Sequence, residues 1–567
     1  MAASDKQFAA IAGRVVIYPD KLVLNVKYDY PAVYSTLSAL QSAVPSPAYG
    51  DAYAVGAARP YRVYVWDGTA WYDNGLELAP MEASWSGSLT FGNGSYAGEE
   101  AEANAVYNSA VDWSQYFSVG DGVFFSGCAR HKENNANHII REISEDKHTL
   151  YFSEYALTLD DGYTVGQDGL AAGVYWFDDT ESGKKYYFTL PAMGQEDKLL
   201  WTGAALTKTV GGASSAVSVS TTEPSAKGTK LALNEEIPYG EPGNITISRD
   251  APELDFIMGH DNRVWGCKGS DIFCSKAGDP MNWYCFEAGI STASWSTAVA
   301  SPGDFTACYS YGGYPLFFKE NIMYKIYGDE PGNYETYDVA AMGVTAGSDK
   351  SLAVAGEVLF WHSPAGIVAY SGAAPAVIGS DLAVFGRSFQ QASAGSDGLK
   401  YYVSMQDRAG NWHLFVYDTT RNLWHREDAL QVSYFCYCQR ELYALAVADG
   451  GYAVWLLGRP KSSGGTTEDG PAFAVEFADF YDAPNKKATC KVLLRLEIDA
   501  GASLNVYAQF DSSGTWELAH SLTSRSKQSC LLPLVLHRCD HYRLMLTGSG
   551  EFTLYSMSRD IAAGSAL

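Results

Sequence analysis

Apolar and polar residues repeat one pattern about every 42 residues across positions 260–448. Each unit contains an aromatic or aliphatic strand, a tight polar turn and a second strand. If Phe318, Trp361, Tyr402 and Tyr443 are equivalent positions, the steps between them are 43, 41 and 41 residues. Repeats of this length that are built from short strands are typical of β-propeller blades. The pattern therefore predicts a propeller.

The N-terminal segment also has the pattern of paired strands. Gly13–Val26 carries apolar residues on both sides of a Pro19-Asp20 turn. In closed propellers an N-terminal strand often completes the last blade. We therefore expect residues 1–27 to supply strands that close the propeller, whose blades we assign to residues 233–460.

A short stretch between these parts alternates strictly. In RVYVWDGTAWYDNG, which begins at Arg62, valine alternates with an aromatic residue, as in a strand with two different faces. The Asp-Gly pair that follows is typical of a hairpin turn, and Trp-Tyr begins the return strand. We assign residues 28–80 to a small inserted aromatic β module.

The remaining segments divide by their spacing of strands and turns. Residues 81–209 carry short strand patterns that predict an inserted β-barrel region, although residues 99–113 have helical composition. Residues 210–232 are poor in large apolar side chains and are expected to be a linker or exposed loop. Residues 461–471 are expected to be a flexible junction. Residues 472–567 hold strands whose spacing suits a β-sandwich or jelly roll, and we assign them to a C-terminal β-sandwich.

The composition agrees with this all-β assignment. Gly 55, Tyr 39 and 14% aromatic residues favour pleated surfaces and frequent turns over helices. No run of 18 apolar residues occurs, so we expect no membrane-spanning segment. The N-terminal sequence MAASDKQFAAIAG lacks the basic start and apolar core of a secretory signal. The 10 cysteines show no C-x-x-C spacing and are expected to be buried free thiols.

The formal net charge is −25. Binding to nucleic-acid phosphates needs clustered Lys and Arg, so this charge argues against a nucleic-acid-binding surface. It leaves open transient contact with DNA that passes through a channel, because an acidic wall would repel DNA and let it slide. The simpler interpretation is that the acidity keeps a large assembly subunit soluble.

Several segments together resemble virion proteins of tailed bacteriophages and prophages. They include VVIYPDK near the N-terminus, HDNRVWGCKGSDIFCSKAGDPMNW from His260 and CDHYRLMLTGSGEFTLYSMSRDIAAGS near the C-terminus. The resemblance covers most of residues 10–30 and 115–560 and is to propeller-containing tail hub, nozzle and head-completion proteins. The aromatic module is similar to a small module of phage tail and fibre proteins. Its position between the first strands and the barrel departs from the plainer family pattern.

Motifs of enzymes are mostly missing. The sequence contains no G-x-S-x-G and no H-E-x-x-H, and the glycine-rich GNGSYAG does not match a dinucleotide-binding turn. The two D-x-x-G-x-W segments, at Asp407 and Asp511, are interpreted as hairpin turns. We therefore expect no enzymatic activity, no catalytic residues and no cofactor.

Two groups of residues remain as candidates for binding. His537, Cys539 and His541 alternate, so on a strand they would share one face and form a triad for a transition metal. We favour the simpler interpretation, an edge strand with ordinary polar residues, and expect no metal. The second group could stack on sugar rings, or could instead form the module's own small core: Tyr64, Trp66, Trp71 and Tyr72.

These observations and the resemblance lead to three hypotheses. The first is a structural virion protein, made in the host cytoplasm, that forms a ring with itself at the tail hub, nozzle or head-to-tail connector. The preferred ring is sixfold; it would extend the DNA channel, contact portal- or adaptor-type connector proteins and dock tail fibres or spikes. The alternative is a receptor- or glycan-binding tail protein. A propeller glycosidase is the third, and the 65 acidic residues do not single out a catalytic pair.

Overall fold

The computed structural model consists of β-strands joined by turns, with one α-helix among the residues that it describes, α1 (Leu37–Ala43). The all-β prediction is confirmed. None of the helices in the described part is long and apolar enough to cross a membrane. Two compact units are distinguished, Met1–Leu457 and Gly458–Leu567. The described residues are 5–26, 30–58, 60–92, 104–129, 131–153, 156–158, 173–179, 184–190, 205–210, 213–217, 219–225, 228–233, 241, 243–340, 342–384, 388–458, 472–481, 487–534 and 538–562.

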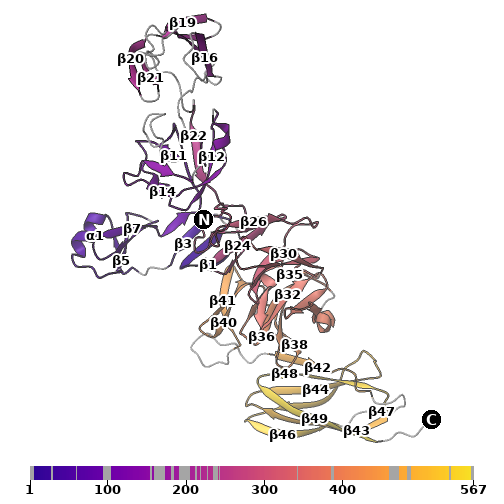
Figure 1. Ribbon diagram of the computed structural model, residues 1–567. Helices are drawn as coiled ribbons and strands as arrows, with labels where there is room; N and C mark the ends of the chain where they lie inside the picture. The colour runs from indigo at the N-terminus through magenta and orange to yellow at the C-terminus, as the bar shows by residue number, and fades with distance from the viewer. Residues whose placement is uncertain are drawn as a thin grey trace. The chain divides into compact units, whose positions relative to one another are not determined.

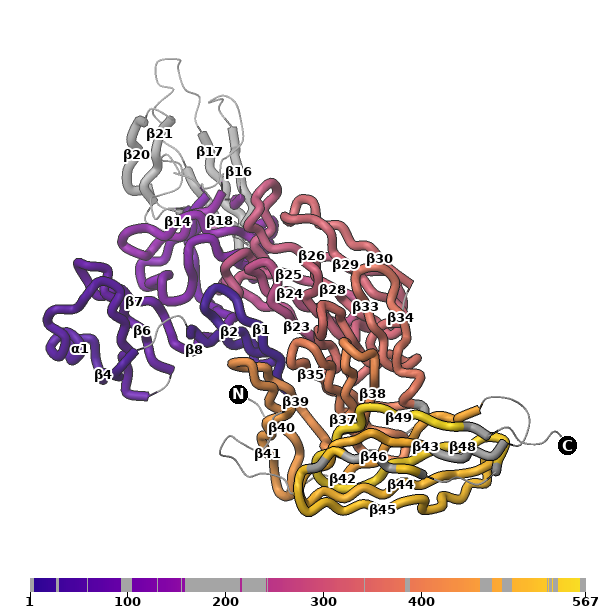
Figure 2. The backbone as a smooth tube through the Cα atoms, turned by 90° about the horizontal axis from the view of Figure 1, so that it is seen from below, coloured from indigo at the N-terminus to yellow at the C-terminus, as the bar shows by residue number. Residues whose placement is uncertain are grey.

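Five successive sheets occupy residues 256–457, and in each of them consecutive strands pair antiparallel (Figures 1 and 2). The first contains β23 (Phe256–His260), β24 (Arg263–Lys268), β25 (Asp271–Cys274) and β26 (Trp295–Ala298). The second contains β27 (Ala307–Tyr311), β28 (Tyr314–Phe318), β29 (Ile322–Tyr327) and β30 (Glu335–Ala340). The third contains β31 (Ala353–Ala355), β32 (Val358–Ser363), β33 (Gly366–Tyr370) and β34 (Ala376–Val377). The last two contain β35 (Phe389–Ser396), β36 (Lys400–Asp407), β37 (Trp412–Asp418) and β38 (Leu423–Asp428), then β39 (Val432–Cys438), β40 (Glu441–Ala448) and β41 (Gly451–Leu457).

These sheets correspond to the repeat seen in the sequence. Phe318, Trp361, Tyr402 and Tyr443 all lie in the second strand of their sheet. Antiparallel four-stranded sheets that follow one another in this way have the architecture of propeller blades. The apolar clusters lie between neighbouring sheets: one joins the first sheet to the second, the next joins the second to the third, and another joins the third to the fourth.

The N-terminal strands form a sheet of their own. Its strands, in order, are β1 (Gln7–Ile11), β2 (Arg14–Tyr18), β3 (Leu22–Asn25) and β8 (Leu78–Pro80). This sheet shares an apolar cluster with the first repeat sheet, in which Tyr18 meets Trp283 edge to face at 6.4 Å. We expected these strands to complete the last blade. In the described residues they pair instead with one another and with β8, and none of them pairs with a strand of the last repeat sheet. The tight turn at Ala12-Gly13 holds β1 beside β2.

The segment predicted as a small barrel forms two sheets around one apolar core. One has the order β10 (Thr90–Phe91), β11 (Ala105–Tyr107), β15 (Thr149–Tyr151) and β14 (Glu142–Ile143). The other has the order β13 (Asn137–Ile139), β12 (Gly122–Ser126), β22 (Ile245–Arg249) and β9 (Ala83–Gly87). Residues 99–113 have helical composition, but their described part holds β11 and the start of a short 3₁₀ turn at Trp113–Gln115. The valine and tyrosine of β11 pair with β15 instead of forming a helix. We call these two sheets the two-sheet body.

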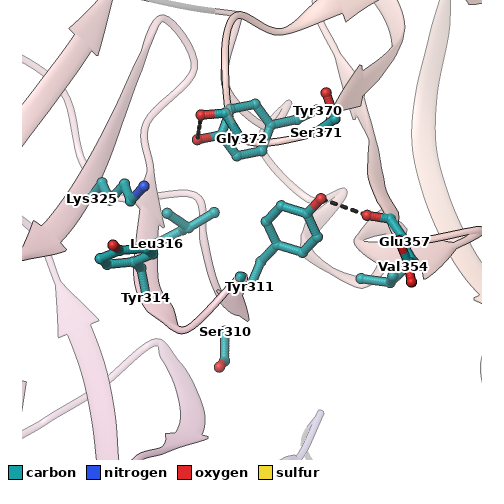
Figure 3. A pocket seen from close by; sticks show the side chains of 11 residues that line it. Ser310, Tyr311, Tyr314, Leu316, Lys325, Val354, Glu357, Tyr370, Ser371 and Gly372 are labelled. Carbon is teal, nitrogen blue, oxygen red and sulfur yellow. Dashed lines mark hydrogen bonds between the residues drawn. The ribbon is translucent and has the colours of Figure 1, made fainter.

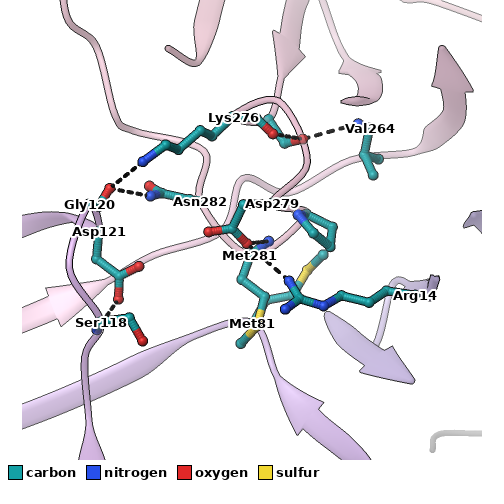
Figure 4. A network of polar contacts seen from close by, with 12 residues as sticks. Arg14, Met81, Ser118, Gly120, Asp121, Val264, Lys276, Asp279, Met281 and Asn282 are labelled. Carbon is teal, nitrogen blue, oxygen red and sulfur yellow. Dashed lines mark hydrogen bonds and ion pairs between the residues drawn. The ribbon is translucent and has the colours of Figure 1, made fainter. Parts of the chain in front are cut away.

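Buried polar contacts attach the two-sheet body to the first repeat sheet's region (Figure 4). Within the two-sheet body, beside this junction, Arg249 of β22 donates to Asp121 at 2.6 Å, and both side chains are almost fully buried. Asn282, after β25, donates to the Gly120 carbonyl at 2.5 Å and accepts from the Gly122 amide at 3.1 Å. No side chain fits at Gly122, because a Cβ there would lie 2.3 Å from the carbonyl oxygen of Tyr284.

Further strands occupy residues 173–233. The backbone forms one sheet of β16 (Gly173–Asp179), β17 (Lys184–Leu190), β18 (Ala205–Val210) and β19 (Ala213–Val217), and a hairpin of β20 (Val219–Ser225) and β21 (Gly228–Leu233). The linker expected at 210–232 is therefore wrong for most of its length. Its many serines and threonines are poor core residues, but its valines and threonines are β-branched and favour the extended backbone that these strands adopt.

The second unit also contains two sheets (Figure 2). One has the order β42 (Ala472–Glu476), β48 (Tyr542–Ser549), β44 (Ser503–Phe510) and β45 (Glu517–Thr523). In the other, β43 (Lys487–Ile498) pairs with β46 (Gln528–Leu534), β47 (Arg538–Cys539) and β49 (Phe552–Ala562). Alternate residues of β43, β44 and β48 are buried in one apolar cluster, which matches the period-2 pattern in the sequence.

The cysteine prediction holds for most of the described cysteines. Six of the eight whose side chains the structure describes are buried, and burial raises the pKa of the Cys274 thiol to about 12. Cys436 and Cys438 are exposed, which differs from the prediction. They lie near the end of β39, where the strand's side chains are no longer covered.

A buried histidine should make the first unit sensitive to acid. Burial lowers the pKa of His362, in β32, to about 4, and its Nδ1 lies 3.1 Å from the Ser348 hydroxyl. In the unfolded chain the pKa is about 6.5, so only the unfolded state takes up the proton as the pH falls from about 6.5 to about 4. We expect the free energy of unfolding to fall by about 3 kcal/mol across that window.

The measurement is chemical denaturation of the whole protein at several pH values. The control is His362→Gln, which keeps a polar partner for Ser348 but cannot titrate. Its unfolding free energy should depend less on pH by about the same amount. Equal pH dependence in the two proteins would contradict the assignment.

Candidate functional site

The aromatic residues singled out in the sequence lie on the module inserted between β3 and β8. Its sheet has the order β4 (Val33–Tyr34), β5 (Ala52–Val55), β6 (Arg62–Trp66) and β7 (Trp71–Leu76). Trp66 is paired with Trp71 across the hairpin, and Tyr64 is paired with Asp73. Paired residues point to the same side of a sheet, so three of the four predicted aromatics, Tyr64, Trp66 and Trp71, share one face.

Two further tyrosines extend this aromatic face. Tyr53 is paired with Tyr64, and Tyr34 contacts Tyr53 with ring centroids 5.7 Å apart. Tyr53 meets Trp71 at 5.8 Å, and Trp71 meets Trp66 at 5.4 Å, all in edge-to-face geometry. These rings are half-buried. The result is a continuous row of rings along a sheet face, which we call the aromatic row.

The core of the module lies on the opposite face. Ala54 and its cross-strand partner Val63 are almost completely buried there, as is Leu40 of α1, the helix that contacts β4 and β5. Tyr72 is paired with Val65 on this side but is 60% exposed. The fourth predicted aromatic therefore does not join the other three. The aromatic row is not the buried core of the module either.

Charged groups flank the aromatic row. Arg62 forms an ion pair with Asp73 at 2.6 Å on the same face. The pKa of the Tyr64 hydroxyl is raised by partial burial and, after that, by the neighbouring carboxylate of Asp73. At the hairpin tip Asp67 accepts hydrogen bonds from the Thr69 and Ala70 amides, both at 2.7 Å, which lowers its pKa and holds the predicted Asp-Gly turn.

Sequence reasoning missed a second surface feature, a cleft between the second and third repeat sheets (Figure 3). It has a volume of about 560 Å³. The Tyr311 hydroxyl donates to the Glu357 carbonyl at 2.7 Å across the two sheets. The Lys325 ammonium lies 3.7 Å from the centre of the Tyr314 ring, a cation–π contact. The tyrosine-rich segment YSYGGY, from Tyr309, was the available signal.

The other candidates bring no binding group together. In the part of the chain that the structure describes, no cluster of three His, Cys, Asp or Glu side chains could hold a metal ion. His537 lies outside the described residues, Cys539 is buried, and His541 Nε2 lies 2.7 Å from the Ser512 hydroxyl. The triad therefore stays an untested hypothesis.

The D-x-x-G-x-W segment at Asp407 is a hairpin turn, as predicted. The Asp407 carboxylate accepts from the amides of Ala409 and Asn411, both at 2.8 Å. Hydrogen bonds from His413 and Asn411 lower its pKa to about 2. Asp511 instead accepts from the Asp540 amide at 2.7 Å, so the second segment is held by the connection between β47 and β48.

Comparisons with known proteins give no close relative. No protein-family model and no curated protein matches the chain. Among solved structures, Hsv2 of Kluyveromyces lactis is 9% identical with a TM-score of 0.25, covering 56% of this chain and 95% of that one. An exo-β-1,3-galactanase of Phanerochaete chrysosporium is 9% identical with a TM-score of 0.15, covering 69% and 97%. The extracellular domain of a one-component system of B. thetaiotaomicron is 10% identical with a TM-score of 0.26, covering 95% and 86%. These likenesses are too distant to indicate a function.

Trp71 should stabilise the module through its ring contacts. It is the only member of the aromatic row between Tyr53 and Trp66, and each edge-to-face contact contributes about 0.5–1.5 kcal/mol. Trp71→Ala should therefore lower the local stability of β5–β7 by about 1–3 kcal/mol, measured by hydrogen exchange of the module's amides. Tyr72→Ala, on the same strand but on the other face, should leave exchange nearly unchanged. Equal effects of the two variants would show that the row does not hold the module.

Proposed function

We propose that the protein is a structural subunit of a tailed-phage virion. In this proposal copies form a ring, with six as the preferred number, at the tail hub, nozzle or head-to-tail connector. The ring extends the DNA channel, contacts portal- or adaptor-type connector proteins and docks fibres or spikes. The resemblance of the N-terminal, repeat and C-terminal segments to virion proteins supports this assignment.

The observation that carries the proposal is the way the appended parts are attached. The Asn282 contacts with Gly120 and Gly122, together with the hydrogen bond that the Asn137 side chain donates to the Tyr284 carbonyl at 2.7 Å, hold the two-sheet body against the region of the first repeat sheet. Leaving a buried hydrogen-bonding group without its partner costs about 1–3 kcal/mol. A subunit that transmits force between neighbours needs attachments of this kind, whereas a flexibly tethered binding domain does not.

The finer architecture belongs to the same proposal. We infer that the repeat sheets and the N-terminal sheet form a propeller disc, that the two-sheet body is the small barrel, and that the second unit is a β-sandwich. The disc supplies rigidity, and the turns and inserted parts supply surfaces for partners. In this proposal the role of the protein is mechanical, and it involves no catalytic residue and no cofactor. The net charge of −25 suits a channel wall along which DNA slides.

The decisive experiment is to locate the protein in an intact particle. Purified virions that contain this chain should show it by mass spectrometry at several copies per tail, and a reconstruction should place it in a closed ring around the tail axis. Labelling by an antibody against the purified protein would be expected at one end of the tail. One copy per tail, or absence from the particle, would contradict the proposal.

A second function, glycan recognition by the tail, is favoured by the aromatic row. Half-exposed indole rings offer flat apolar faces to the C–H faces of sugars. The Arg62–Asp73 pair beside them offers polar groups for sugar hydroxyls. Under this alternative the module would bind a polysaccharide of the host surface.

Binding to a glycan array separates the two functions. If the alternative holds, the purified protein retains a bacterial surface glycan, and Trp66→Ala lowers the affinity by about tenfold, since loss of one stacking face of about 1–2 kcal/mol has that effect. Tyr72→Ala, an exposed aromatic on the other face, is the matched control. The structural proposal alone expects no retention on any glycan.

A further inference from the structure

The cleft between the second and third repeat sheets has the size and lining of a site for a small ligand (Figure 3). Its volume of about 560 Å³ lies within the range of about 300–1,000 Å³ that ligand pockets occupy. The second sheet supplies Tyr311, Tyr314 and Lys325, and the third sheet and its turns supply Glu357 and Tyr370. The proposed virion role makes no use of this cleft.

Lys325 brings a positive charge to the cleft. Its ammonium lies 3.7 Å from the centre of the Tyr314 ring and 4.8 Å from that of Tyr327. In the part of the chain that the structure describes, it forms no ion pair with a carboxylate. Other lysines of the first unit do form such pairs: Lys6, Lys21, Lys147, Lys268 and Lys350. The Lys325 ammonium can therefore donate charge-assisted hydrogen bonds to an anionic group of a ligand.

Hydroxyl and backbone groups line the rest of the cleft. The Tyr311 hydroxyl donates to the Glu357 carbonyl at 2.7 Å, and the Tyr370 hydroxyl donates to the Gly372 carbonyl at 3.3 Å. Each of these hydroxyls can still accept a hydrogen bond, and the Ser371 hydroxyl can both donate and accept. The Glu357 carboxylate is an acceptor for the hydroxyl groups of a ligand.

Tyrosine rings continue from the cleft along the same face of the second sheet. Tyr337 is paired with Lys325 across β29 and β30, so the two side chains point to one side. The ring centroids of Tyr314 and Tyr327 are 5.1 Å apart, and those of Tyr327 and Tyr337 are 6.0 Å apart. Tyr327 is 39% exposed and Tyr337 is 59% exposed. These rings offer flat apolar faces beside polar hydroxyls.

This combination of groups selects one class of ligand. A sugar presents apolar C–H faces and many hydroxyls, and an acidic sugar adds a single carboxylate. Nucleic-acid phosphates need clustered Lys and Arg, but Lys325 is the only cation among the described residues that line the cleft. An apolar ligand would leave the ammonium and the hydroxyls of the cleft without partners. An acidic sugar satisfies the rings, the hydroxyls and the ammonium together.

We propose that this cleft binds a saccharide that carries a carboxylate. The carboxylate pairs with Lys325, the sugar hydroxyls bind Ser371 and the Glu357 carboxylate, and the C–H faces lie against the tyrosine rings. Figure 3 shows Lys325 and Glu357 on opposite sides of Tyr311, so the carboxylate of the ligand is kept away from that of the protein. The site goes beyond the proposed virion role, does not depend on it, and is separate from the aromatic row.

The test is calorimetric titration of the full-length protein with three acidic oligosaccharides, containing galacturonate, glucuronate and sialic acid. Each is compared with its methyl ester, which keeps the sugar but lacks the charge. We expect at least one acid to bind, and its ester to bind at least about tenfold more weakly, because the ester cannot pair with the ammonium.

Three variants assign the binding to the cleft. Lys325→Met keeps an apolar side chain but removes the charge, so the acid should bind no better than its ester. Lys325→Arg keeps the charge and should preserve the preference for the acid. The matched control is Lys268→Met, which removes an exposed lysine from the first repeat sheet and should leave the titration unchanged.

The outcomes separate this site from the aromatic row. Binding that Trp66→Ala weakens belongs to the row, whereas binding that Lys325→Met weakens belongs to the cleft. Equal binding of acid and ester, or binding that survives Lys325→Met, would overturn the proposal. So would a failure of all three acids to bind at millimolar concentration. A glutamate peptide that binds as tightly as the sugars would overturn it as well, because the cleft would then accept any carboxylate. The virion role is decided separately, by the particle reconstruction.

Discussion

Face-to-face contact between neighbouring sheets is the interaction on which the repeat region depends. Each of the first four repeat sheets is covered on both faces, so its second strand is buried along most of its length, as in β28, β32 and β36. The clusters that fill these contacts contain large rings such as Trp265, Phe317 and Trp361. A sheet removed from this stack would expose two apolar faces at once, which explains why the chain repeats the unit instead of using it alone.

This double burial is also why the repeat could be predicted. A strand that is covered on both sides reads as an unbroken apolar run, and LFF, LFW and YYV recur at nearly constant spacing. The attachment of the two-sheet body could not be read in the same way. Asn282 and Gly120, which make this attachment, are 162 residues apart, and nothing local in the sequence marks Asn282 as a partner of that turn. The strands between 210 and 233 were missed because their side chains are small and polar, although their backbone is extended.

Only part of the candidate site, the aromatic row, could be predicted from the sequence. Alternation in β6 correctly separated valine from aromatic residues, and cross-strand pairing then placed Trp71 beside Trp66. The sequence could not tell which face is the core, because that depends on Leu40 of a short helix that covers the valine side. It also could not supply Tyr34, which lies in a two-residue strand with no periodic signal. The sequence grouped Tyr72 with the aromatic row because it is aromatic and directly follows Trp71. Adjacent residues of a strand point to opposite faces, so Tyr72 lies on the other side of the sheet.

The place where the module enters the N-terminal sheet has a consequence for how the protein could diversify. β3 ends at Asn25 and β8 begins at Leu78, and the two strands pair directly, with the Asn25 amide 2.8 Å from the Glu77 carbonyl. The chain thus leaves the sheet and returns to it at adjacent points. A module joined in this way is an exchangeable cassette: recombination could replace it with another of any size, or with a plain hairpin, without altering the sheet that carries it.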